Sequence, residues 1–248
     1  MKDVCVVGSG YWGINLVRNF HTLDRLALVC DSSASALSNV RSKFPGVPTE
    51  TDFRRVLERS DVSAVVIATP AATHYELARA AIQAGKDVLV EKPMALKSSE
   101  ARELAELALS RKRVLMVGHI LQYHPGMLKL KELVSSGELG TLEYIYSNRL
   151  NLGKIRREEN ALWSFAPHDI SIMLWLTACE PIQVTAAGGN YLQPNVADTT
   201  LSTLVFDKGV RGHIFVSWLH PFKEQRLVVV GSKRMATFVD GAPKGEKL

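Results

Sequence analysis

The sequence lacks the features that mark secreted and membrane-spanning proteins. Its three cysteines, Cys5, Cys30 and Cys179, are odd in number, widely spaced and set among apolar residues. They predict buried, reduced thiols, and neither a disulfide framework nor a metal site. No apolar run approaches the roughly 18 residues of a membrane span, and no signal-peptide pattern follows Met1. We therefore expect a cytoplasmic protein that does not insert into a membrane.

Aromatic residues are also scarce, at 7% of the chain, and the basic residues behind its net charge of +5 are scattered. Nucleic-acid-binding surfaces cluster basic residues and interleave them with aromatic ones, so no nucleic-acid partner is expected. The positive charge instead suits small molecules that carry phosphate. With 248 residues, 46% of them hydrophobic, the chain is long enough for two packed domains.

The glycines near the start of the chain carry a specific pattern. Gly8, Gly10 and Gly13 form G-x-G-x-x-G between the strand-like "DVCVV" and the helical "INLVRNF". In a dinucleotide-binding fold these glycines allow a tight turn, close approach of a pyrophosphate and close helix packing. Asp31 follows about 20 residues on, where a carboxylate accepts hydrogen bonds from ribose hydroxyls. No arginine adjoins Asp31, which favours NAD over NADP. The alternative is an ordinary strand–turn–helix connection with a surface aspartate.

Strands and helices alternate up to about residue 125 and predict a doubly wound parallel sheet. Successive extended runs then predict an antiparallel sheet, interrupted by one helix from about Pro167 to Thr177. We place a dinucleotide-binding domain at residues 1–122 and an α+β domain at 123–248. Ligands of parallel sheets bind at the carboxyl ends of the strands. The polar residues expected at those ends are Asp31, Thr69, Glu91, Lys92 and His119.

Two stretches carry candidate chemistry. In "EKPMAL", Lys92 ends a strand before a proline, where its ammonium would donate to a substrate hydroxyl or take part in proton transfer. In "SFAPHDIS", His168 and Asp169 follow Pro167, a residue favoured in the first turn of a helix. The helix dipole would then disfavour protonated His168 and suit it to act as a general base. The alternatives are a surface lysine, a capping or packing histidine and, for "KIRREE", a solvated loop.

These stretches, together with "ATPAATHYELA", resemble the glucose-fructose oxidoreductase, inositol dehydrogenase and MocA (Gfo/Idh/MocA) family over essentially the whole chain. The resemblance implies a Rossmann doubly wound parallel sheet followed by an open, mainly antiparallel sheet. It also implies an NAD-dependent oxidoreductase in which Lys92 and His168 surround the reacting carbinol. His168, or the pair together, would handle the proton while the nicotinamide takes the hydride. Many members have an aspartate four residues before the histidine, where this chain has Ser164. Asp169 is then the candidate to tune His168.

Within the family, "NLGKIRREENALWSFAPHDIS" and "GHILQYHPG" resemble a nucleotide-sugar branch that oxidises UDP-N-acetylglucosamine or UDP-N-acetylglucosaminuronate at C3. The alternatives are a free-sugar or inositol dehydrogenase, and a non-catalytic NAD-binding regulator. The family usually has further chain beyond the last expected strand. Alternating apolar residues in "GHIFVSWLH" and "TLSTLVF" predict a homo-oligomer formed through the open sheet.

The candidate site residues follow from these motifs and from the resemblance. The catalytic candidates are Lys92, His168 and Asp169. The cofactor-binding candidates are Gly8, Gly10, Tyr11, Trp12, Gly13, Asp31, Thr69, Pro70, His74, Glu91 and Lys92. The substrate-binding candidates are Gln122, His124, Arg149, Lys154, Arg156, Arg157 and Asn160. No metal is expected.

Overall fold

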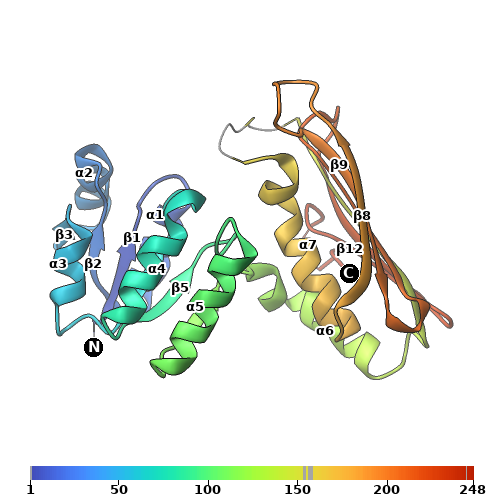
Figure 1. The fold of residues 1–248 in the computed structure, drawn as a ribbon, viewed down its shortest axis with the longest axis horizontal. Helices are drawn as coiled ribbons and strands as arrows, with labels where there is room; N and C mark the ends of the chain where they lie inside the picture. Colours follow the sequence, from blue (N-terminus) through green and yellow to red (C-terminus); the bar gives the residue numbers. More distant parts are fainter. Residues whose placement is uncertain (1, 153–154, 156–158, 244) are drawn as a thin grey trace. The chain divides into compact units, whose positions relative to one another are not determined.

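The computed structural model describes residues 2–152, 155, 159–243 and 245–248. The chain divides into two compact units, Met1–Gly118 and His119–Leu248, here called the N-terminal and C-terminal units (Figure 1). The sequence-based boundary at residue 122 lies a few residues later. Within the described residues, no helix combines the length and the apolar character needed to cross a membrane.

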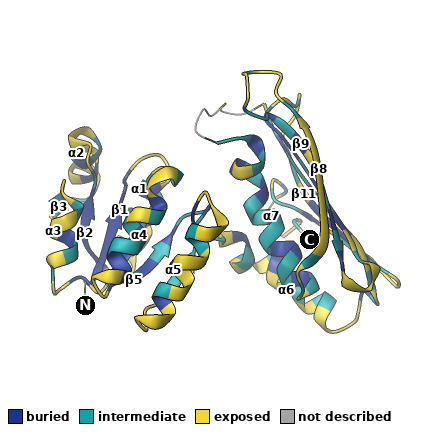
Figure 2. Ribbon diagram, in the orientation of Figure 1, coloured by how far each residue is buried: buried dark blue, intermediate teal, exposed yellow. Residues whose placement is uncertain are grey.

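The N-terminal unit is built on a six-stranded sheet in the order β3-β2-β1-β4-β5-β6. All of its strand pairs are parallel, which confirms the expected doubly wound sheet. The central strands are short apolar runs, rich in Val and Leu, that are buried on both faces, as a parallel sheet between helices requires (Figure 2). The strands are β1 (Val4–Val7), β2 (Leu26–Cys30), β3 (Thr49–Glu50), β4 (Ala64–Ile67), β5 (Asp87–Val90) and β6 (Leu115–Val117).

Helices cover both faces of this sheet. Helices α1 (Gly13–Thr22) and α2 (Ala34–Lys43) pack on one face, in the cluster that contains Val6 and Val66. The other face is covered by α3 (Phe53–Glu58), α4 (His74–Gln83) and α5 (Ser98–Ser110).

Two of the three cysteines lie inside the N-terminal unit. Cys5 and Cys30 are buried free thiols, and Cys179, in the C-terminal unit, is a partly buried free thiol. Burial raises the pKa of the Cys30 thiol to about 12, so this thiol stays protonated and unreactive at neutral pH.

The C-terminal unit carries a six-stranded sheet in the order β12-β11-β7-β10-β9-β8. Only the β7–β10 pair among its described strands is parallel, which confirms the expected mainly antiparallel sheet. The strands are β7 (Leu142–Leu150), β8 (Pro181–Gly189), β9 (Thr199–Phe206), β10 (Arg211–Ser217), β11 (Glu224–Gly231) and β12 (Met235–Val239).

One face of this second sheet is covered by α7 (Ala161–Thr177) and α6 (Pro125–Ser135) (Figure 1). Alternate residues such as Phe206 and Ile214 point to this side and are fully buried in the core, which also contains Trp218. No helix of the described chain covers the opposite face of the sheet (Figure 1).

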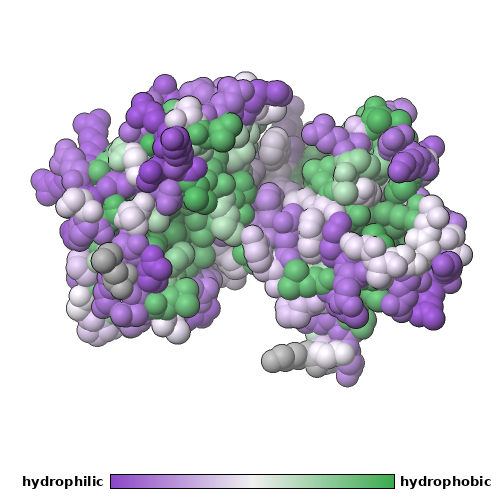
Figure 3. Space-filling view, turned by 90° about the horizontal axis from the view of Figure 1, so that it is seen from below, coloured by the Kyte–Doolittle hydropathy of each residue, from purple (hydrophilic) through white to green (hydrophobic). Residues whose placement is uncertain are grey.

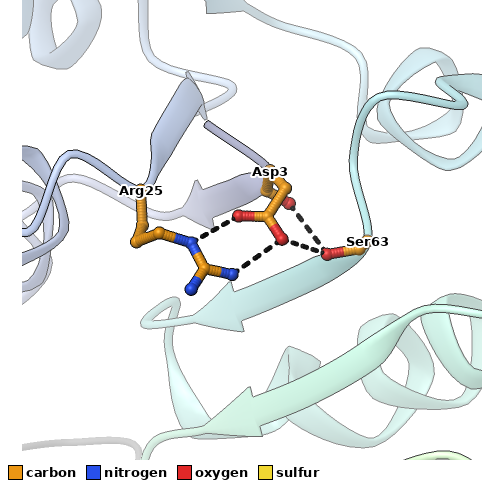
Figure 4. Close-up of polar contacts among 3 residues, drawn as sticks. All are labelled: Asp3, Arg25 and Ser63. Atoms are coloured by element: carbon orange, nitrogen blue, oxygen red, sulfur yellow. Dashed lines mark hydrogen bonds and ion pairs between the residues drawn. The ribbon is translucent and has the colours of Figure 1, made fainter. Parts of the chain in front are cut away.

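A polar cluster joins three strands of the N-terminal unit at their amino ends (Figure 4). The guanidinium of Arg25 donates two hydrogen bonds to the carboxylate of Asp3, at 2.7 and 2.8 Å, and the Ser63 hydroxyl donates a third at 2.6 Å. These residues directly precede β1, β2 and β4. The bonds from Arg25 and Ser63 lower the pKa of Asp3 from 3.8 to about 2.

We expect Asp3→Asn to lower the free energy of unfolding by about 1–3 kcal/mol at neutral pH, because the bonds to a charged acceptor are lost. The folded-state pKa of Asp3 lies below its unfolded value, so its stabilisation is complete above about pH 4 and is lost as the pH falls toward about 2. Urea unfolding across this range measures both effects.

Asp61→Asn is the control, because the carboxylate of Asp61 pairs with Arg59 while its side chain is 56% exposed. This variant should lose less stability than Asp3→Asn, because exposed ion pairs contribute little. Equal losses in the two variants would contradict the role given to the Asp3 cluster.

Candidate active site

The three glycines shape the turn from β1 into α1. Gly8 has a φ of +88°, and a Cβ there would lie 2.8 Å from the carbonyl carbon of Ala68, just beyond β4. A Cβ on Gly13 would overlap the carbonyl oxygen of Gly8. A Cβ on Gly10 would meet no described atom within 4 Å. The turn therefore packs tightly against the sheet and leaves its backbone open at Gly10.

Asp31, which directly follows β2, is tied to this turn. Its Oδ2 accepts hydrogen bonds from the backbone N–H and the hydroxyl of Ser9, at 2.7 and 3.0 Å, and its Oδ1 accepts one from the N–H of Ser33 at 2.9 Å. A cavity of about 620 Å³ opens beside the turn. The open backbone, the cavity and the anchored carboxylate fit a dinucleotide. The cavity is lined by Ser9, Gly10, Tyr11, Ile14, Asn15, Ser35, Ala36, Asn39 and Lys43.

Trp12 and Glu91 join the glycine turn to the E-K-P segment that follows β5. The Trp12 indole N–H donates to Glu91 Oε1 at 2.6 Å, and Glu91 Oε2 accepts the backbone N–H of Lys92 at 3.3 Å. A Cβ on Gly118, just beyond β6, would lie 3.0 Å from the Glu91 carboxylate. The Glu91 side chain is thus enclosed by three neighbouring segments at the carboxyl edge of the sheet, and Lys92 beside it is half-buried.

The other cofactor candidates lie on the same edge. Tyr11 is 96% exposed on the glycine turn. The hydroxyls of Thr69 and Thr73 are hydrogen-bonded at 2.7 Å, and Thr73 also donates to the carbonyl of Pro70 at 2.8 Å. His74 is only 1% exposed, and both of its ring nitrogens contact backbone carbonyls. The structure therefore gathers the cofactor candidates at one edge and buries the His74 ring behind it.

The helix that carries His168 begins earlier than expected. Helix α7 starts at Ala161, and the N-cap Asn160 accepts the backbone N–H of Trp163 at 3.0 Å. The predicted start at Pro167 was wrong, because this proline lies inside the helix. The dipole acts mainly within the first turn, so it gives no support for a neutral His168. Asn160, expected to contact substrate, caps the helix instead.

His168 lies half-buried in α7, with a second histidine nearby. The rings of His119 and His168 meet edge to face, with centroids 6.3 Å apart. The Ser171 hydroxyl donates to the His168 carbonyl at 2.7 Å. From the sequence, His119 was predicted only to be a polar residue at the end of a strand. Its contact with His168 was not predicted.

Asp169 and Arg149, predicted as a catalytic and a substrate-binding residue, are paired with each other. Arg149 Nε lies 2.6 Å from Asp169 Oδ2, and their side chains are 12% and 3% exposed. The Ser147 hydroxyl donates to Asp169 Oδ1 at 2.6 Å. These contacts fasten α7 to β7. Ser147 was missed in the sequence, since an isolated serine in a strand carries no signal of its own.

The remaining substrate candidates have structural contacts or lie outside the described residues. Gln122 donates from Nε2 to the carbonyl of Ser171 at 3.3 Å. His124 Nδ1 accepts the backbone N–H of Gly126 at 3.0 Å and thereby caps α6, while its ring packs edge to face on Phe238. Lys154, Arg156 and Arg157 lie outside the described residues.

Comparison with known proteins assigns the family. Residues 2–119 match the model described as "Oxidoreductase family, NAD-binding Rossmann fold". Residues 127–237 match the Gfo/Idh/MocA C-terminal domain. The chain belongs to the Gfo/Idh/MocA family. The N-terminal unit of this family member is therefore an NAD-binding Rossmann domain, in agreement with the cavity beside the glycine turn.

Several relatives are similar over most of this Gfo/Idh/MocA chain. UDP-N-acetylglucosamine 3-dehydrogenase of Acidithiobacillus ferrooxidans is 32% identical over 74% of this chain and 56% of its own length. Inositol 2-dehydrogenase 2 of Saccharopolyspora erythraea is 28% identical over 84% of this chain and 64% of its own. The crystal structure of GenD2 from gentamicin A biosynthesis, in complex with NAD, has a TM-score of 0.88 at 29% identity, over 96% of this chain and 72% of that one. The chain thus spans less than two thirds of both sequence relatives.

We expect Arg149→Met to lower the free energy of unfolding by about 3–5 kcal/mol, because it leaves the buried Asp169 carboxylate without its cation. The double variant Arg149→Met/Asp169→Leu should recover part of this loss, since it removes both charges. Urea unfolding followed by circular dichroism measures the free energy of unfolding of the wild type and of both variants.

Arg234→Met provides the matched control. Arg234 pairs with Glu138 at 2.8 Å, but the two side chains are 67% and 48% exposed, so the expected loss is below about 1 kcal/mol. A loss this small for Arg149→Met would show that the Asp169 pair does not hold α7.

Proposed function

We propose that this chain is an NAD-dependent dehydrogenase that oxidises the C3 hydroxyl of UDP-N-acetylglucosamine to a ketone. The observation that carries the proposal is the placement of Lys92 at the cofactor edge, next to Glu91, which Trp12 links to the glycine turn. His168 supplies the second reacting side chain. The choice of sugar is supported by the 32% identical relative from Acidithiobacillus ferrooxidans. The free thiols of Cys5 and Cys30 support a cytoplasmic location.

In the proposed reaction, NAD accepts the hydride when it is bound. The backbone around Gly10 and the amino end of α1 hold its phosphates, and Asp31 accepts hydrogen bonds from its ribose. The Lys92 ammonium donates to the reacting oxygen and stabilises the negative charge that develops there. The imidazole of His168 takes the hydroxyl proton.

We expect UDP-N-acetylglucosamine to reduce NAD in the presence of the wild-type chain, and free N-acetylglucosamine and myo-inositol to do so far more slowly. His168→Asn should lower turnover by about 100-fold or more, the usual scale for loss of a general base. Lys92→Met should also lower turnover, and both variants should keep their affinity for NAD. The absorbance of reduced nicotinamide measures the rates.

His220→Asn is the control for replacing a histidine, since the ring of His220 packs on Phe222 and Phe215 and has no role in the proposed reaction. Full activity of His168→Asn would place the base elsewhere.

An inositol dehydrogenase is the second candidate, supported by the 28% identical relative from Saccharopolyspora erythraea. The diphosphate of the substrate distinguishes the two candidate functions, because UDP-N-acetylglucosamine carries one and myo-inositol does not. Since Arg149 is paired with Asp169, diphosphate recognition falls to Lys154, Arg156 and Arg157. Faster reduction of NAD by myo-inositol than by UDP-N-acetylglucosamine would favour the second candidate. Binding of NAD without turnover of either compound would favour a non-catalytic regulator.

For the cofactor, we expect the wild-type chain to bind NAD more tightly than NADP. The Asp31 carboxylate, fixed by Ser9 and Ser33, would meet the 2′-phosphate of NADP as a like charge. Asp31→Ala should narrow the difference between the two dissociation constants, measured by calorimetry. Asp61→Ala, which removes an exposed carboxylate, should not. Equal affinities in the wild type would contradict the assignment.

The helix-free face of the C-terminal sheet supports assembly with a second copy. The strand register sets Thr203, His213, Tyr146 and Val228 in one row across this face, and the Tyr146 and His213 rings stack at 5.3 Å. Leu201, one row along, is 49% exposed. Figure 3 shows that hydrophobic side chains interrupt the hydrophilic surface of both units. We propose that two sheet faces pack together in a homo-oligomer.

We expect sedimentation velocity to show a dimer or larger assembly for the wild type. Leu201→Arg should shift it toward the monomer, because it places a charge on the face that is proposed to be buried. Leu109→Arg, at an 81% exposed leucine in the N-terminal unit, should leave the assembly unchanged. A monomeric wild type at micromolar concentration would contradict the proposal.

A further inference from the structure

His74 lies between two loops at the carboxyl edge of the N-terminal sheet. Its Nδ1 is 2.7 Å from the carbonyl oxygen of Pro93, and its Nε2 is 2.9 Å from that of Thr69. The residue is 1% exposed. Both ring nitrogens therefore contact backbone acceptors inside the protein, and the ring bridges two segments that are distant in sequence.

The two bridged loops follow neighbouring strands. β4 and β5 pair in parallel, with Ile67 opposite Val90, and Thr69 and Pro93 come shortly after them. The first loop is also held by hydrogen bonds within it, because the Thr73 hydroxyl is hydrogen-bonded to the Thr69 hydroxyl and to the carbonyl of Pro70. The second loop contains Lys92, bonded directly to Pro93. His74 thus connects the hydrogen-bonded loop after β4 to the segment that carries the proposed reacting lysine.

The ring holds both loops at once. Each of its nitrogens lies within hydrogen-bond distance of one backbone carbonyl, and the residue is closed off from solvent. Displacement of either loop would therefore remove one of the two contacts.

We propose that His74 is a positioning residue that fixes the backbone of Lys92 relative to Thr69. This inference rests on the proposed dehydrogenase function for its effect on rate. His74 acts through Lys92, and its proposed partners are the two carbonyls rather than the reacting atoms. Its assignment as a cofactor contact is replaced by this role.

The main experiment compares His74→Leu with His74→Gln and with His21→Leu, a control on α1 in which an exposed ring that packs on Phe44 is lost. With NAD and UDP-N-acetylglucosamine, His74→Leu should lower kcat by about 10- to 100-fold, because small displacements of a reacting group have effects of this size. The KM for the sugar should change by less than about threefold, since substrate contacts are retained. His74→Gln keeps an amide donor and should recover part of kcat. Unchanged kcat in His74→Leu would overturn the proposal.

One measurement does not depend on turnover. The acetylation rate of Lys92, followed by mass spectrometry, should change several-fold in His74→Leu while that of exposed Lys97 stays constant. The change should be smaller in His74→Gln, which keeps an amide donor. An unchanged Lys92 rate in His74→Leu would overturn the proposal. A chain that shows the expected labelling but reduces NAD with no tested sugar would instead count against the proposed function alone.

Discussion

The close packing of the glycine turn is the constraint on which the N-terminal unit depends. Gly13 lies against the carbonyl of Gly8, and Gly8 lies against the end of β4, so α1 starts directly at the edge of the sheet. This placement brings Ser9 to Asp31 and Trp12 to Glu91. One backbone turn therefore positions both Asp31, the carboxylate proposed to bind the ribose, and the segment that carries Lys92.

The C-terminal unit depends on a buried ion pair instead of a backbone turn. Arg149 on β7 and Asp169 on α7 are almost fully buried and in direct contact, and Ser147 completes the carboxylate's hydrogen bonds. Because Asp169 adjoins His168, the pair fixes the part of the helix that presents the candidate base. Removing one partner would leave an unpaired buried charge, so single substitutions in this ion pair should be strongly destabilising.

The sequence predicted the features that are written in local patterns. The glycine spacing, the β-branched strands and the aspartate after β2 each follow from a short stretch, and the structure places them as expected. The start of α7 was misplaced because Pro167 occupies an unusual interior position, although Asn160 before an apolar run was a readable N-cap signal. The pairing of Arg149 with Asp169 and the burial of His74 depend on how β7 meets α7 and β4 meets β5. No local pattern encodes such contacts between distant segments.

The most direct test of this account is the affinity of Gly10→Ala for NAD. A Cβ at Gly10 meets no described atom within 4 Å, so the variant should unfold at nearly the same urea concentration as the wild type. The same methyl group would obstruct the approach of the pyrophosphate, and we expect NAD to bind at least about tenfold more weakly. Gly241→Ala, where a Cβ is equally free of described contacts, is the control and should bind NAD normally. Calorimetric titration that finds wild-type affinity in Gly10→Ala would contradict the assignment of this turn as the cofactor site.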